Sequence, residues 1–344
     1  MNLKRNAIAD QLKGLAVLFM VQVHLMELFA NQDVYASALG KISLFLGGPT
    51  AAPVFMGVMG YFIAASSKSL FQALYRGVKL IFLGLLLNVG INLHLMKHII
   101  DVGLDLSPLE FIFGVDILFL AGFSVIIISI LKSLFRKNVW LFGGSLLLTL
   151  IISSFTNTLH PNIYFWKFVI ACFYGNYTWS YFPLLPWLAY PLAGFIVFLL
   201  KDHIEIIMRN KKFRLAFVLI ASVMVLSTFS QAFTITYKLP QYYHHDGLFF
   251  LWTMVFLSLY TLVLKFLIII PVLEPIMKYI SWIGKNVTSF YVIQWLLIGN
   301  IATSIYKTQS IWQLQAWFLI IILIAALMTY AWNYYIKRDP TDVL

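Results

Sequence analysis

Long apolar runs recur along the whole of this 344-residue chain, and no hydrophilic domain separates them. Hydrophobic residues make up 61% of the sequence, and charged residues only 11%. An ordinary soluble protein has about a quarter of its residues charged. A soluble globule of this length could not bury so much apolar surface. The sequence therefore predicts an all-α, polytopic transmembrane bundle, and it excludes a water-soluble enzyme, a disordered chain and a nucleic-acid-binding domain.

The apolar runs predict ten membrane-spanning helices. We expect them at 11–30, 49–66, 73–93, 109–131, 139–156, 183–200, 213–232, 248–270, 286–304 and 311–334. The aromatic stretch 160–182 is left open between a plain loop and a re-entrant or interfacial element. Since no internal repeat of fixed period is present, we expect a single transmembrane domain over residues 1–344.

Basic residues predict the orientation of the chain. The net charge is +11, but Lys and Arg sit in short segments between apolar runs, where they set topology. With both termini in the cytoplasm, Lys4 and Arg5 at one end and Lys337 and Arg338 at the other are inside. The outer loops then hold only five of the 24 basic residues, namely Lys41, Lys97, Lys167, Lys238 and Lys307. This asymmetry favours an even number of spans with both termini cytoplasmic.

The first predicted helix carries four ionisable residues on one stripe: Asp10, Lys13, His24 and Glu27. From Lys13 to His24 the helix turns about 1100° and rises about 16 Å, which puts Lys13 near the cytoplasmic surface and His24 beyond the midplane. For Asp10 and Lys13, an interfacial i, i+3 ion pair is the simpler interpretation. An ionisable residue deep in a bilayer is costly and marks function. We therefore favour His24 as a general base, with Glu27 one turn away to fix its tautomer.

Other polar residues are predicted near the membrane. Asp116 is expected several residues into the fourth helix, either as a functional carboxylate or as one held by a neighbouring helix or the outer boundary. Asn88 and Asn92 favour interhelical hydrogen bonds. Gly57 and Gly60 favour close helix packing.

One polar cluster, Tyr242 to Asp246, precedes the eighth helix. Adjacent residues such as His244 and His245 rarely chelate one ion well, so we expect no metal site. Tyr243, His244, His245 and Asp246 suit a hydroxylated acceptor such as a sugar, although a solvated loop is the simplest interpretation.

Several motifs resemble a known family. The stretch from Arg5 through Asp10-Gln-Leu-Lys13-Gly14 to His24 resembles the opening of the acyltransferase-3 superfamily, and 52–62 resembles its second-helix signature. The segments 114–122 and 182–194 are similar to landmarks of small bacterial proteins related to heparan-α-glucosaminide N-acetyltransferase, and 283–294 resembles a penultimate-helix motif. Two residues depart from the pattern. Gln294 stands where many relatives have histidine, and Met59 where many have serine.

The resemblance implies a multi-pass acyltransferase of a bacterial inner membrane. It would move an acetyl group from cytoplasmic acetyl-CoA to a hydroxyl or amine of a glycan or similar acceptor at the far side. His24 would be the base, oriented by Glu27 or Asp116, and a covalent acyl-histidine route stays open. The basic inner helix ends, with Lys13, its partner Asp10 and Arg76, suit the phosphates of CoA. The alternative is a proton-coupled transporter or flippase with His24, Glu27 and Asp116 as a relay.

Overall fold

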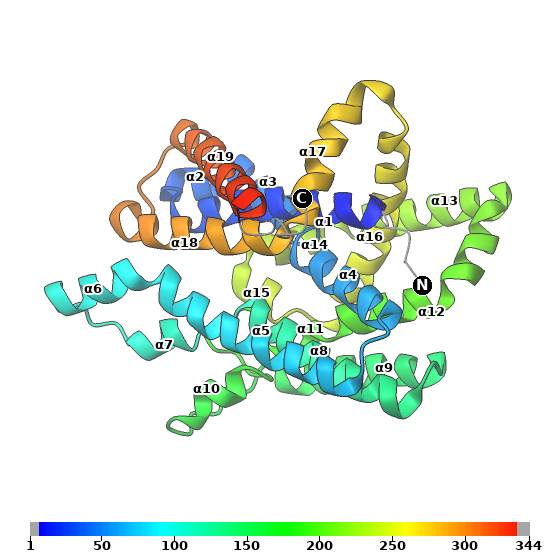
Figure 1. Ribbon diagram of the computed structural model, residues 1–344, viewed down its shortest axis with the longest axis horizontal. Coiled ribbons are helices and arrows are strands. Elements are labelled where there is room, and N and C mark those ends of the chain that lie inside the picture. Colours follow the sequence, from blue (N-terminus) through cyan, green and yellow to red (C-terminus); the bar gives the residue numbers. More distant parts are fainter. Residues whose placement is uncertain (1–6, 336–344) are drawn as a thin grey trace, which may run out of the picture. The chain divides into compact units, whose positions relative to one another are not determined.

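The computed structural model describes residues 7–335, so the terminal basic residues Lys4, Arg5, Lys337 and Arg338 lie outside the described residues. The described chain is built from helices (Figure 1). Its β pairing is limited, within residues 7–335, to two isolated bridges, Ala30 with Gln309 and Val115 with Ser180. The predicted all-α class is confirmed.

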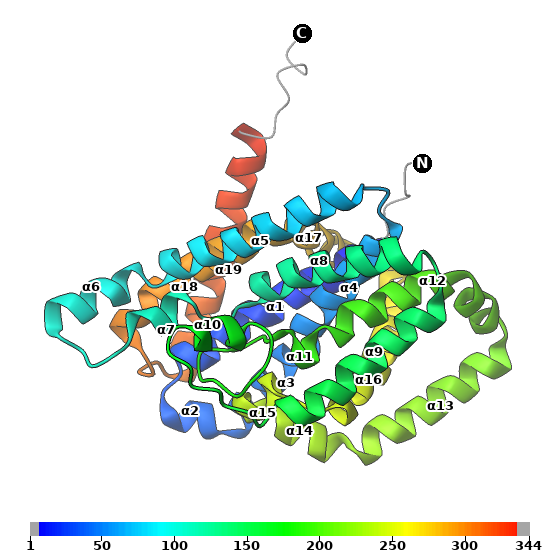
Figure 2. The ribbon, with the colours of Figure 1, turned by 90° about the horizontal axis from the view of Figure 1, so that it is seen from below.

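Nine helical segments in residues 7–335 are long and apolar enough to cross a membrane. They are α1 (Ala7–Leu28), α3 with α4 (Ala38–Gly47 and Ala52–Ala65), α5 (Leu70–Ile91), α8 (Ile117–Phe135), α9 (Val139–Thr156), α11 with α12 (Leu184–Trp187 and Ala189–Arg209), α16 (Gly247–Ile268), α18 (Val287–Ile305) and α19 (Ile311–Tyr335). A tenth candidate consists of α13 (Lys211–Ser227) and α14 (Phe229–Tyr237), which are bent by 57° (Figure 2). The predicted polytopic bundle is confirmed, and each predicted run corresponds to one of these candidates.

Two predicted helices differ in detail. The helix expected over 213–232 is not straight, because the chain breaks at Thr228 between α13 and α14. The helix expected over 109–131 is divided, because α7 (Pro108–Ile112) ends before α8 begins at Ile117. Asp116 has an extended backbone at this break, so the prediction that it lies inside the fourth helix is wrong.

The stretch 160–182 folds as a packed segment with one short helix, α10 (Trp166–Ala171). The hydroxyl of Tyr177 donates to the carbonyl of Pro161, and Ser180 Oγ donates to the carbonyl of Ala171 at 2.7 Å. The remaining short elements are α2 (Gln32–Ala36), α6 (Leu93–Val102), α15 (Leu239–Tyr243), the 3₁₀ turn η1 (Pro271–Leu273) and α17 (Glu274–Lys285).

The helices group into two compact units. The first comprises Met1–Ala51, Gly90–Asp105 and Leu264–Leu344. In it α1 packs against α3, α17, α18 and α19. The crossing of α1 and α17 depends on glycine: a Cβ at Gly14 would collide with the carbonyl oxygen of Ile280, and one at Gly284 with that of Asp10. The two backbones therefore touch directly beside Asp10 and Lys13.

The second unit comprises Ala52–Val89 and Leu106–Val263. Here α12 packs along α4 and α9 (Figure 2). A Cβ at Gly60 would collide with the carbonyl oxygen of Pro191, and one at Gly194 with that of Gly57. The predicted close packing at Gly57 and Gly60 is confirmed. Glycine also lets α5 approach α8, since a Cβ at Gly77 would lie 2.8 Å from the carbonyl oxygen of Gly122.

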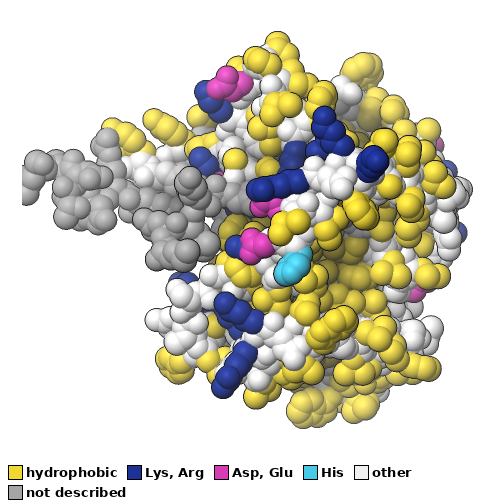
Figure 3. Space-filling view, turned by 90° about the vertical axis from the view of Figure 1, so that its right-hand side faces the viewer, with side chains coloured by type: hydrophobic (Ala, Val, Ile, Leu, Met, Phe, Trp, Pro, Cys, Tyr) yellow, Lys and Arg dark blue, Asp and Glu magenta, His cyan; other side chains and the backbone are white. Residues whose placement is uncertain are grey.

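Large apolar side chains are exposed in both units, as expected of helices that face lipid. Examples are Trp140, which is 84% exposed, Phe71 at 79% and Trp312 at 75%. Figure 3 shows apolar side chains over much of one face, interrupted by Lys and Arg. The surface agrees with the predicted membrane setting.

Candidate active site

Asp10 and Lys13 form an ion pair at the start of α1. Lys13 Nζ lies 2.9 Å from Asp10 Oδ1, and Asp10 is only 4% exposed. Asp10 lies where α17 approaches α1 at Gly284, and Lys13 supplies the counter-charge that a buried carboxylate requires. The predicted i, i+3 pair is confirmed.

His24 lies on α1, partly buried, with its ring held by two neighbouring residues of α18. Its Nδ1 is 3.3 Å from Gln294 Oε1. The indole of Trp295 covers the ring, with centroids 3.8 Å apart and planes at 31°. One hydrogen bond and one ring contact therefore fix the orientation of the imidazole.

The amide of Gln294 identifies the tautomer of His24. Gln294 is fully buried, and its Nε2 donates to the carbonyl of Tyr291 at 3.2 Å. This leaves Oε1 facing the imidazole. An amide oxygen only accepts, so Nδ1 of His24 carries the proton and donates it. In the neutral ring the lone pair is then on Nε2, which has no hydrogen-bond partner among residues 7–335. An imidazole in this tautomer can accept a proton from a substrate.

Gln294 was not predicted as a site residue. The available signal is its place in the penultimate-helix motif, where the resemblance implies a histidine and this sequence has glutamine. A buried polar residue in an otherwise apolar helix needs a partner, and His24 is that partner.

Glu27 lies one turn beyond His24 on α1. The structure gives Gln294 as the hydrogen-bond partner of the imidazole. Burial, and secondarily the negative charge of Glu27, raise the pKa of Tyr35 on α2 to about 12. An orienting role of Glu27 toward His24 stays a prediction.

Asp116 is the N-cap of α8. Its Oδ1 accepts a hydrogen bond from the backbone N–H of Ile117 at 2.6 Å. Asn88 braces the same break, donating to the carbonyl oxygens of Ile112 and Gly114 at 3.0 and 2.7 Å. The interhelical role predicted for Asn88 is confirmed. Asp116 has a structural role at this helix start, and its role as an orienting group or relay stays a prediction.

His245 belongs to a buried aromatic cluster in the second unit. It is 2% exposed, with Nδ1 2.8 Å from the carbonyl of Tyr242 and Nε2 3.0 Å from the hydroxyl of Tyr190. Its ring meets that of Trp187 edge-on, with centroids 4.9 Å apart. Burial lowers the pKa of His245 to about 4, which outweighs its hydrogen bond to Tyr242 and the charge of Asp246. The solvated-loop interpretation is wrong for His245 and Tyr242.

The other members of this cluster are also held in place. The indole N–H of Trp187 donates to the carbonyl of Tyr243 at 2.8 Å. The exposed Asp246 accepts from the N–H of Phe249 at 2.9 Å, near the start of α16. His244 is partly buried, and burial lowers its pKa to about 4. An acceptor-binding role for Tyr243, His244, His245 and Asp246 stays a prediction.

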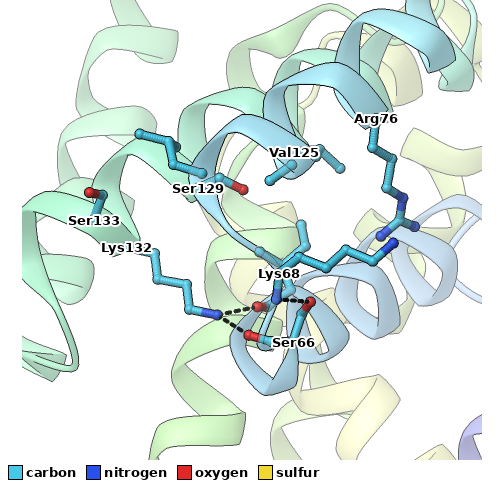
Figure 4. A pocket seen from close by; sticks show the side chains of 10 residues that line it. Ser66, Lys68, Arg76, Val125, Ser129, Lys132 and Ser133 are labelled. Atoms are coloured by element: carbon cyan, nitrogen blue, oxygen red, sulfur yellow. Dashed lines mark hydrogen bonds between the residues drawn. The ribbon is translucent and has the colours of Figure 1, made fainter.

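Arg76 lines a cavity of about 250 Å³ in the second unit (Figure 4). The walls come from the end of α4, the start of α5 and the last turns of α8. The lining residues are Ile63, Ser66, Lys68, Leu70, Ala73, Arg76, Val125, Ser129, Lys132 and Ser133. Lys68 and Lys132 are not among the predicted site residues, and the structure places both in the same lining as Arg76.

No group of three or more His, Cys, Asp or Glu residues within 7–335 is arranged to hold a metal ion. The described chain combines apolar helices long enough to cross a membrane with an oriented histidine and a basic cavity. These features define a polytopic membrane protein.

Sequence comparison gives the family. The profile of the heparan-alpha-glucosaminide N-acetyltransferase catalytic family matches residues 5–221, which is more than half of the chain. The chain belongs to this family and is a membrane acetyltransferase. The matched region contains Asp10, Lys13, His24, Arg76 and Asp116, whereas Gln294 and the Tyr242–Asp246 cluster lie beyond it. No curated protein and no solved structure matches the chain. The resemblance to this branch is confirmed, and the wider acyltransferase-3 grouping stays a prediction.

Proposed function

We propose that this protein transfers the acetyl group of acetyl-CoA to a hydroxyl or amine of a glycan or similar acceptor, with His24 as general base. The observation that carries the proposal is the pairing of His24 with Gln294, which leaves Nε2 as the basic atom. The family match supports acetyl transfer over a proton-coupled transporter.

The proposed step is direct transfer. Nε2 of His24 takes the proton of the acceptor O–H or N–H while the acceptor oxygen or nitrogen forms a bond to the thioester carbonyl carbon. The carbon–sulfur bond breaks, and the CoA thiolate leaves and receives the proton from the imidazolium. Gln294 is the positioning residue, because its Oε1 accepts from Nδ1–H before and after the proton moves. The indole of Trp295, in close contact with the imidazole, hinders rotation of the ring.

The proposed setting is a bacterial inner membrane with both termini in the cytoplasm. The asymmetry of Lys and Arg along the sequence supports it. Acetyl-CoA would then enter from the cytoplasmic side, and the acceptor would meet the acetyl group at the far side. The rise of α1 from Lys13 to His24, about 16 Å, is similar to the length of a pantetheine arm. Asp10 offsets the charge of Lys13, so Arg76 is the stronger of the two proposed phosphate contacts.

The test is His24→Ala, assayed for acetyl transfer and for acetyl-CoA binding on the same purified sample. Loss of a general base lowers kcat by about 10² to 10⁴-fold. We expect that loss with acetyl-CoA affinity unchanged, since the base touches the reacting atoms and not the phosphates. Normal turnover by His24→Ala contradicts the proposal. If an acetylated form of the wild-type protein accumulates in the absence of acceptor, the acyl-histidine route is favoured over direct transfer.

A further inference from the structure

Two cations converge in the cavity at the ends of α4, α5 and α8. In Figure 4 the ammonium of Lys68 and the guanidinium of Arg76 point toward one another. Lys132 also lines the cavity, and none of the described residues lining it is an acid. Like charges repel, so a site that gathers cations without a carboxylate is suited to an anion that lies between them.

Lys132 has a different role from the other two cations. Its Nζ donates to the carbonyl oxygens of Ile63, Ala64 and Ser66 at 2.9, 3.2 and 2.6 Å. An ammonium has three donors, so this lysine is fully used in closing the end of α4. It contributes positive charge to the cavity, while its hydrogen bonds hold one wall in place.

Lys68 and Arg76 keep their donors available. Their side-chain nitrogens have no hydrogen-bond or ion-pair partner within residues 7–335. A guanidinium presents a planar fork that binds phosphate through two parallel hydrogen bonds, and an ammonium adds a point charge. The hydroxyl of Ser129 lies in the same lining and can add a further hydrogen bond.

The walls around these donors are closely packed and partly apolar. Arg76 is followed by Gly77, where α5 touches the backbone of α8 at Gly122. Ile63, Leu70 and Val125 supply apolar lining. Lys68 and Arg76 are themselves exposed, so an anion can reach them from outside, and solvent weakens their attraction for it.

We infer that this cavity is a phosphate-binding site in which Lys68 and Arg76 hold the phosphate and Lys132 supports the wall. The phosphate could come from two sources. The first is the adenosine phosphates of acetyl-CoA, and for this source the inference rests on the proposed function and deepens it. The second source of the same chemistry is the headgroup of an anionic lipid.

The experiment measures binding of adenosine 3′,5′-bisphosphate and acetyl-CoA to the full chain in nanodiscs of neutral phosphatidylcholine, by calorimetry. The variants are Lys68→Gln, Arg76→Gln and the milder Arg76→Lys. Lys79→Gln, a loss of the same charge on α5 outside the cavity, is the matched control. Removing one charged hydrogen-bonding group weakens bisphosphate binding by about tenfold. We expect this for the two Gln variants, a smaller loss for Arg76→Lys, and little change for the control.

A second arm uses nanodiscs that contain phosphatidylglycerol, with retained lipid counted by native mass spectrometry. Weaker bisphosphate binding in Lys68→Gln and Arg76→Gln supports the donor as the source. Unchanged bisphosphate binding with loss of retained phosphatidylglycerol supports the site with lipid as the source. If neither binding changes while the variants melt like the wild type, the inference is overturned.

The same data separate this inference from the proposed function. If acetyl-CoA binds equally to the wild type and the cavity variants, and lipid retention is also equal, the phosphate-site inference is contradicted. Acetyl-CoA then remains the proposed donor. If acetyl-CoA does not bind the folded wild type, the proposal that acetyl-CoA is the donor is contradicted. The phosphatidylglycerol experiment still tests whether the cavity binds phosphate.

Discussion

Two histidines of this protein, His24 in the first unit and His245 in the second, differ in how their ring nitrogens are used. His245 uses both ring nitrogens inside the protein, one on the carbonyl of Tyr242 and one on the hydroxyl of Tyr190. His24 uses one nitrogen, on Gln294, and its Nε2 has no hydrogen-bond partner among residues 7–335. Two occupied nitrogens make His245 a structural crosslink, whereas a ring held at Nδ1 alone has the free Nε2 that our proposal for His24 requires.

The two histidines also differ in how closely other side chains surround them. Trp187 meets His245 edge-on and is itself fully buried, so the ring is part of a packed core. Trp295 covers one face of His24, and His24 remains partly exposed. The comparison teaches that two enclosed histidines can differ in the number of ring nitrogens they have available, and this difference makes His24 the candidate base.

The largest effect should come from His245→Ala. The change opens a cavity among Trp187, Tyr190 and Tyr242 and leaves a buried hydroxyl unpaired. We expect a loss of about 3 kcal/mol in the free energy of unfolding. His24→Ala should lower it by less than about 1 kcal/mol, since that ring has fewer internal bonds. Denaturant unfolding in one detergent checks both. Equal losses would show that the two histidines are not structurally different.

A pH dependence of stability should follow from His245. Because its pKa is about 4 in the folded chain and 6.5 when exposed, the unfolded chain binds more protons between these values. Stability therefore falls as pH drops from 6.5 to 4, by about 3 kcal/mol for this residue. His244 acts in the same direction. Thermal midpoints measured across this range should fall less steeply in His245→Asn, and an identical slope in the variant would contradict the assignment.

The positions of the membrane helices could be predicted from the sequence, but most of the difference between the two histidines could not. Apolar runs of about twenty residues predict spans directly, because a bilayer fixes their length. Asp10 and Lys13 were predictable as a pair because three residues make nearly one turn. Gln294 is 270 positions from His24, and no local spacing encodes that contact.

The local sequence also gave a wrong prediction at the start of α8. The sequence around Asp116 is apolar on both sides, so a single helix was predicted through it. The extended backbone of Asp116, braced by Asn88 from another helix, is a tertiary feature. Likewise, Tyr242 to Asp246 reads as polar in sequence, but Trp187 and Tyr190 enclose part of it.

Gln294 variants should sharpen the role of His24. Gln294→Leu removes the acceptor of Nδ1–H, so we expect kcat to fall about tenfold with KM unchanged. Gln294→Glu keeps an acceptor and adds a negative charge that stabilises imidazolium. It should retain more activity, with the acidic limb of its pH–rate profile moved to higher pH.

Steady-state rates from pH 5 to 9 check this pair of variants, with Trp295→Phe as a control that preserves the Nδ1 hydrogen bond. A purely structural role for Gln294 would lower the rate without moving the profile. If Gln294→Glu and wild type share one pH profile, Gln294 does not act through the imidazole.

The smallest effect should come from changes at Asp116. The structure makes Asp116 the N-cap of α8, whereas the sequence predicts it inside a helix. Asp116→Ala removes the acceptor for the N–H of Ile117, and loss of an N-cap costs about 1 kcal/mol of stability. Asp116→Asn keeps an acceptor oxygen and should be nearly as stable as wild type. Denaturant midpoints of the two variants check the difference. If Asp116→Asn lost as much stability as Asp116→Ala, the negative charge would matter more than the cap, and the carboxylate would rejoin His24 as a candidate for proton chemistry.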